Sequence, residues 1–197
     1  MTALAAPRHP LIEQALADAR AWCAGQTIDD RPALIHAVRV AATLDRHVPG
    51  ASPQLIAAAL LHDAPELAPP GLDLRAVLVA TYGQEVARIV RALHIEHLAL
   101  DQPDPPILAD DGAVLLASTA DKIVALTSLL RRARASGNPD GFFTVRLALL
   151  RLLPHFHAYQ QAGSGRVPVS MSTHLDAVLT TLHHATTGAR KARRITV

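Results

Sequence analysis

His62 and Asp63 close an apolar run of the sequence that extends from Leu55 to Leu61. Glu66 follows three residues after Asp63, so on a helix the three polar side chains project toward one side. Imidazole and carboxylate groups in such a cluster can hold a divalent metal ion or move protons. A lone His-Asp pair is more often part of a solvated helix end, so other positions must decide.

Two further residues favour a metal site. His36 lies in an apolar segment whose helix must bury one face. Asp121 lies in the middle of the apolar segment 113–130, where a buried carboxylate costs several kcal/mol unless it is paired or metal-bound, and the adjacent Lys122 supplies only part of that compensation. The resulting mixed nitrogen and oxygen set suits manganese, iron or another divalent ion that keeps open water positions, as a catalytic site does: His36, His62, Asp63 and Asp121.

The order of these residues resembles that of the HD phosphohydrolase superfamily. Further segments are similar to the hydrolase domain of bifunctional alarmone synthetase/hydrolases and to their small stand-alone relatives. The similar segments are Gly25-Gln26-Thr27 before His36, Ala58-Ala59-Leu60-Leu61-His62-Asp63 followed by Glu66, Tyr82-Gly83 with Val86 and Val90, and Ala120-Asp121-Lys122. The resemblance covers roughly residues 11–130.

This resemblance implies an all-helical HD-domain bundle with a manganese ion at the four positions above. It also implies a small-molecule nucleotide substrate and removal of the 3′-pyrophosphate from guanosine penta- and tetraphosphate. Glu66 is expected to be the catalytic acid/base, because a carboxylate one helical step from the ligands can exchange a proton with the metal's water. Gln26, Arg31 and His97 are expected to contact the substrate.

The chain also departs from the family pattern at several positions. Leu67 stands where the second residue of a catalytic Glu-Asp pair is expected, and Ile28-Asp29 replace a basic pair for which Arg31 could substitute. Ala125 replaces an Asn, and His94-Ile95-Glu96-His97 replaces a Thr-Asp-Asp-Lys run. Two alternatives therefore stay open: an HD-type nucleotidase or pyrophosphatase acting on another nucleotide, and a nucleotide-binding module whose catalytic site has decayed.

Other basic residues allow more than one interpretation. His94 and His97 are three residues apart and could form a phosphate clamp, a second metal site or a solvated helix end. Arg131, Arg132 and Arg134 could reach phosphates, although cations are favoured in a last helical turn for dipole reasons alone.

The composition predicts that helices position these residues. Ala and Leu are abundant, aromatic residues make up 3% of the chain, and Pro and Gly punctuate apolar segments of helical period. We expect a single all-α domain over residues 1–188, followed by a basic tail, 189–197. About eight helices are expected, at 11–24, 31–47, 54–66, 72–80, 84–98, from Asp110-Asp111 to Gly137, 141–160 and 172–187.

Charge and hydropathy narrow the possible partners. The formal charge of +2 does not call for a nucleic-acid partner, and the basic tail is typical of a solvated end. No apolar run reaches the roughly 18 residues that span a bilayer, and no secretory signal is evident. The single Cys23 predicts a buried thiol in a reducing compartment, hence the cytoplasm. The sequence leaves the oligomeric state open.

Overall fold

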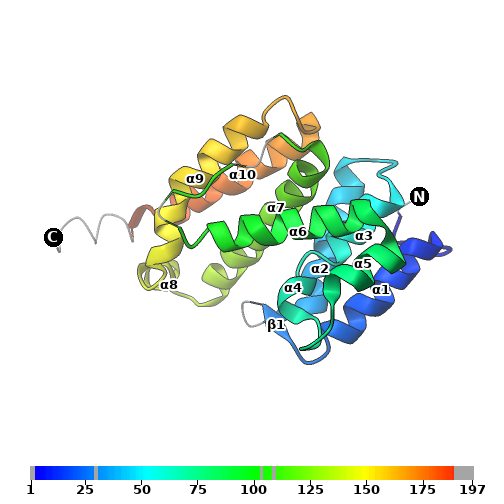
Figure 1. Ribbon diagram of the computed structural model, residues 1–197. Helices are drawn as coiled ribbons and strands as arrows, with labels where there is room; N and C mark the ends of the chain where they lie inside the picture. Colours follow the sequence, from blue (N-terminus) through cyan, green and yellow to red (C-terminus); the bar gives the residue numbers. More distant parts are fainter. Residues whose placement is uncertain (1–2, 29–30, 103, 108–109, 189–197) are drawn as a thin grey trace.

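The computed structural model describes residues 3–28, 31–102, 104–107 and 110–188, and it confirms the predicted all-α class. The expected basic tail, 189–197, and Asp29 lie outside the described residues. Ten helices are present in the described ranges: α1 (Pro10–Trp22), α2 (Ala33–His47), α3 (Pro53–Leu60), α4 (Ala64–Leu67), α5 (Leu74–Tyr82), α6 (Gln84–Ala99), α7 (Gly112–Ala135), α8 (Pro139–Thr144), α9 (Leu147–Gly163) and α10 (Val169–Ala185). In Figure 1, α1 to α5 lie at one end of the molecule, α8 to α10 at the other, and α6 and α7 between them.

Helix α3 lies at the centre of the first end and contacts α1, α2, α6 and α7. The Ser52 hydroxyl caps its start by accepting a hydrogen bond from the Leu55 N–H at 3.2 Å, and Pro53 occupies the first turn. Every residue from Leu55 to Leu60 is buried, including three consecutive alanines. Because alanine side chains are small, neighbouring helices can approach α3 from all sides.

The prediction of a single helix over 54–66 is wrong. Helix α3 ends at Leu60, and a separate short helix, α4, begins at Ala64. Pro65 accounts for the break, because proline has no N–H to donate to the carbonyl four residues earlier and its ring clashes with that carbonyl. Pro65 instead takes a position in the first turn of α4, where its missing N–H costs nothing. His62 and Asp63 therefore lie on a turn between two helices.

A second predicted helix, 141–160, is also divided. The side chain of Asn138 accepts a hydrogen bond from the Gly141 N–H at 2.9 Å and Pro139 follows it, so α8 begins earlier than expected. Helix α8 ends at Thr144, and α9 begins at Leu147. These two divisions turn the eight expected helices into ten.

A short antiparallel hairpin precedes α2 and was not predicted. Strand β1 (Thr27–Ile28) pairs with β2 (Arg31–Pro32), so that Ile28 lies opposite Arg31. Within the described residues, these two strands form the only sheet.

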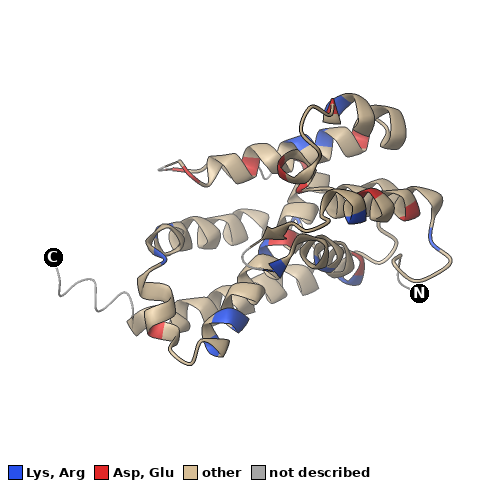
Figure 2. Cartoon of the chain, turned by 90° about the horizontal axis from the view of Figure 1, so that it is seen from below, with Lys and Arg blue, Asp and Glu red and all other residues tan. Residues whose placement is uncertain are grey.

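Helix α7 is the long core helix that α2 and α10 contact. It is long and apolar enough to cross a membrane, but 72% of its most apolar window is buried inside the protein, as in the core helix of a soluble protein. Basic and acidic residues are spread over several helices, whereas α3 carries none (Figure 2).

Candidate metal centre

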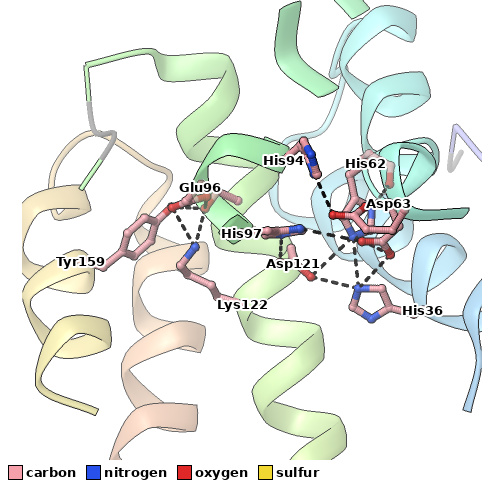
Figure 3. A network of polar contacts seen from close by, with 12 residues as sticks. His36, His62, Asp63, His94, Glu96, His97, Asp121, Lys122 and Tyr159 are labelled. Carbon is pink, nitrogen blue, oxygen red and sulfur yellow. Dashed lines mark hydrogen bonds and ion pairs between the residues drawn. The ribbon is translucent and has the colours of Figure 1, made fainter. Parts of the chain in front are cut away.

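Three separate segments bring the four predicted ligands together (Figure 3). His36 comes from α2, His62 and Asp63 from the turn after α3, and Asp121 from the middle of α7. His62 is fully buried, and the other three side chains are 12–13% exposed. The cluster is therefore shielded from bulk water but open on one side.

The distances between the facing atoms suit a shared ion. His36 Nε2 lies 3.2 Å from His62 Nε2 and 3.0 Å from Asp121 Oδ1. His62 Nε2 lies 3.2 Å from Asp63 Oδ2, and the remaining cross-distances are 3.7 and 3.8 Å. Neighbouring ligands that bind one ion at about 2.1 Å are roughly 3.0–3.4 Å apart in octahedral or tetrahedral geometry. The residues whose ligand atoms all lie within 4.8 Å of one another are His36, His62 and Asp121; Asp63 is not in this set and meets it through the two histidines.

The end of α3 orients the His62 ring. Carbonyl groups in the last turn of a helix lack intrahelical donors, and the Ala59 carbonyl accepts a hydrogen bond from His62 Nδ1 at 2.8 Å. This bond places the proton on Nδ1 and directs Nε2 toward the other three residues. The helix break caused by Pro65 therefore leaves the Ala59 carbonyl available to orient the His62 imidazole.

Three polar atoms of the cluster would gain a partner from a cation. Asp63 Oδ2 is buried and makes no hydrogen bond. The Nε2 atoms of His36 and His62 face each other, so two neutral rings with lone pairs on these atoms would repel. A divalent ion among the four side chains would satisfy all these atoms, so the donor set fits a metal.

Without a metal, protons compensate the same charges. Burial opposes protonation of His62, but the carboxylates of Asp63 and Asp121 outweigh it and raise the pKa of His62 to about 9. Burial would raise the pKa of Asp121, yet hydrogen bonds from His36, His62 and His97 hold that pKa well below its usual range. A metal ion would compete with protons for this site.

Helix α6 contributes two histidines beside the cluster. His97 Nε2 lies 3.2 Å from Asp121 Oδ2, and His97 Nδ1 lies 4.0 Å from Asp63 Oδ1. His94 Nδ1 lies 2.8 Å from Glu66 Oε1. The two rings therefore hold a predicted metal ligand and the predicted catalytic carboxylate.

The other two predicted substrate residues lie outside the cluster. Gln26 is exposed, and its backbone carbonyl accepts a hydrogen bond from the Ala33 N–H at 3.1 Å. Arg31, on β2, lines a small hollow of about 30 Å³ together with His36 and Arg39. Arg31 therefore lies close to one ligand, whereas no contact joins the Gln26 side chain to the four ligands.

Lys122 does not compensate Asp121 in the way expected. Its Nζ atom lies 2.9 Å from Glu96 Oε1 and 2.7 Å from Ser118 Oγ, and it packs over the Tyr159 ring. The buried pair joins α6 to α7 on the side away from the metal ligands (Figure 3). The histidines, and not Lys122, supply the hydrogen bonds to the Asp121 carboxylate.

A scan against models of known protein families found no match for this chain, and a search of curated proteins found no significant match either.

Proposed function

We propose that the chain is a metal-dependent phosphohydrolase acting on a small-molecule nucleotide. The observation that carries the proposal is the convergence of His36, His62 and Asp121 at distances suited to one divalent ion, with Asp63 Oδ2 3.2 Å from His62 Nε2. Two nitrogen and two oxygen ligands leave coordination positions for water and substrate, which favours catalysis over a structural metal.

The side chains around the ligands have separate roles in such a reaction. A divalent ion such as manganese, when bound, polarises a phosphoryl oxygen and makes water more acidic. Glu66 accepts the proton of the attacking water, and His94 holds the Glu66 carboxylate through their 2.8 Å contact. His97 holds the Asp121 carboxylate in place through Oδ2.

The expected substrate class is a purine nucleotide that carries a 3′-phosphate or 3′-pyrophosphate, as the resemblance to alarmone hydrolases implies. We expect turnover of guanosine tetraphosphate to be weaker than in that family. Leu67 cannot orient water as a carboxylate does, and Ile28 cannot bind phosphate; misorientation of this kind costs on the order of a hundredfold in rate. A nucleotidase or pyrophosphatase acting on another nucleotide is the second candidate, favoured by these same replacements. The buried Cys23 thiol suits a cytoplasmic protein.

A substrate panel with added manganese tests the proposal. Guanosine tetraphosphate is compared with nucleoside mono-, di- and triphosphates, a dinucleotide phosphate and pyrophosphate, and the His62→Ala variant serves as the inactive control. We expect release of phosphate or pyrophosphate that depends on manganese and on His62. A preference for 5′-monophosphates would assign the chain to the nucleotidases, and binding of a nucleotide without turnover would make it a binding module.

A further inference from the structure

A second polar cavity lies beside α2 and α7, away from the metal ligands. Its volume is about 310 Å³. Residues of α2, α7 and α10 line it: Arg39, Ala42, Thr43 and Arg46, then Ile123, Val124, Thr127, Ser128 and Arg131, and His174. Three arginines border this space, and none of its lining residues is acidic.

These three arginines differ from the paired arginines elsewhere in the chain. Arg8 pairs with Glu13, Arg88 with Glu85 and Asp111, and Arg166 with Asp110. Among the described residues, Arg39, Arg46 and Arg131 have no acidic partner within ion-pair distance. Like charges gathered without counter-charge repel one another, which favours an anion among them.

One polar side chain adds to the case for an anion. The Thr127 hydroxyl is buried and has no hydrogen-bond partner in the described structure. A buried hydroxyl donor beside uncompensated guanidinium groups is the set that binds phosphate oxygens.

The cavity is a site of its own and not part of the metal centre. Arg46 follows His36 by ten residues on α2, and Arg131 follows Asp121 by ten residues on α7. Ten helical residues span about 15 Å. A single phosphate is too small to contact both the metal ligands and these two arginines. Arg39, Val124 and Ser128 line both this cavity and the small hollow beside His36, so the two spaces adjoin, whereas Arg46 and Arg131 border the cavity alone.

We infer that this cavity, bordered by Arg39, Arg46 and Arg131, binds a diphosphate group. Its volume exceeds that of a single phosphate, and planar guanidinium groups bind phosphate oxygens in pairs. The diphosphate can be inorganic pyrophosphate or the diphosphate of a nucleotide. The site does not depend on the proposed hydrolysis, because none of the four predicted metal ligands lines the cavity. Only His36 lines the adjoining hollow.

Calorimetry on the full chain tests this site without interference from a metal. The protein is stripped of metal, exchanged into chelator-free buffer, checked for folding by circular dichroism and titrated with inorganic pyrophosphate. We expect saturable binding that weakens at least tenfold in an Arg46→Gln/Arg131→Gln variant. Arg75→Gln is the matched control, because Arg75 is exposed on α5 and also lacks an acidic partner among the described residues. It should leave the affinity unchanged.

A milder variant guards against loss of folding. Thr127→Val keeps the side-chain shape and removes the hydroxyl donor, so we expect weaker binding of pyrophosphate by a folded protein. Competition then distinguishes the sources: a nucleoside diphosphate that displaces pyrophosphate with higher affinity identifies a nucleotide, and failure to displace it identifies the inorganic anion. Absence of saturable binding, or equal loss in the Arg75→Gln control, would overturn the inference whether or not the chain hydrolyses nucleotides.

Discussion

Glu66 is held at one oxygen by the His94 ring, with 2.8 Å between Oε1 and Nδ1. Because Gln keeps the shape of Glu and loses its basicity, Glu66→Gln should lower kcat by roughly 10²–10⁴-fold while metal content stays unchanged. Steady-state kinetics at saturating manganese, with metal analysis of the same samples, measures both. Activity equal to that of the unaltered protein would leave Glu66 a surface residue of α4.

In the proposed reaction His94 positions Glu66 and does not touch the substrate, so its removal should have a smaller effect. We expect His94→Ala to lower kcat by roughly tenfold and to leave KM unchanged, because Glu66 then loses the partner that orients it. His184→Ala, which alters an exposed histidine of α10, is the control. A change in KM with kcat unaltered would show that His94 binds substrate and does not position Glu66.

Residue types and their apolar surroundings indicate four candidate ligands, because a polar group in a buried segment must have a partner. Their partners do not follow from the sequence. Lys122 is adjacent to Asp121 in sequence, yet it bonds with Glu96 on α6. His94 and His97 could be placed on one helix face, but which carboxylate each would meet depends on how α6 packs against α4 and α7. The metal itself stays a prediction.

At the scale of helices, the pair formed by Lys122 and Glu96 joins α7 to α6, and its side chains are 5% and 2% exposed. Lys122→Met leaves the Glu96 carboxylate buried without its cation, so the free energy of unfolding should fall by about 3–5 kcal/mol. Adding Glu96→Gln removes the stranded charge and should recover part of this loss. Urea unfolding of both variants checks the prediction. The control is Glu85→Gln, which alters an exposed ion pair and should lower the free energy of unfolding by at most about 1 kcal/mol. A similarly small cost for Lys122→Met would contradict the prediction for the buried pair.

A histidine pair joins α2 to α10 and should make that contact sensitive to acid. His47 Nε2 lies 3.0 Å from His174 Nδ1, and burial, followed by neighbouring positive charge, lowers the pKa of both rings. At pH values above the unfolded pKa of about 6.5, both rings are neutral in the folded and unfolded states. As pH falls below that value, the unfolded chain takes up protons first, so the free energy of unfolding decreases.

Urea unfolding at pH 7.5 and pH 5.5 tests this dependence. The His47→Gln/His174→Gln variant should lose less stability on acidification than the unaltered protein, because two of the groups that bind extra protons in the unfolded state are gone. His183→Gln/His184→Gln carries the same change in composition on exposed positions of α10. If the first variant and the unaltered protein lose the same free energy of unfolding between pH 7.5 and pH 5.5, the histidine pair does not set the acid response.

Helix positions follow from the sequence better than helix breaks do. Apolar periodicity and the start and stop residues predict the eight segments. The break after Leu60 depends on a single residue, Pro65, within an otherwise helical segment. The break between Thr144 and Leu147 has no comparable signal in the sequence. The first break matters most, because it moves His62 and Asp63 from a helix face to a turn and frees the Ala59 carbonyl for the His62 ring.

For the molecule as a whole, the four ligands join segments that are distant in sequence: α2, the turn between α3 and α4, and the middle of α7. A metal that binds the folded chain and not the unfolded one stabilises it by about 2.7 kcal/mol when its concentration is a hundred times Kd. For a chain of this size such a gain raises Tm by roughly 5–10 °C. We therefore expect manganese to raise the Tm of the metal-stripped protein by this amount.

Differential scanning calorimetry of the metal-stripped protein, with and without manganese, measures the shift. His62→Ala removes the buried ligand at the centre of the cluster, so manganese should no longer change its Tm. His184→Ala keeps the cluster intact and should respond as the unaltered protein does. Because the ion is expected to hold three distant segments together, the gain should come with slower amide exchange in α2, around Asp63 and in the middle of α7. An equal manganese shift in His62→Ala would place the ion elsewhere and remove the basis for assigning these four residues as its ligands.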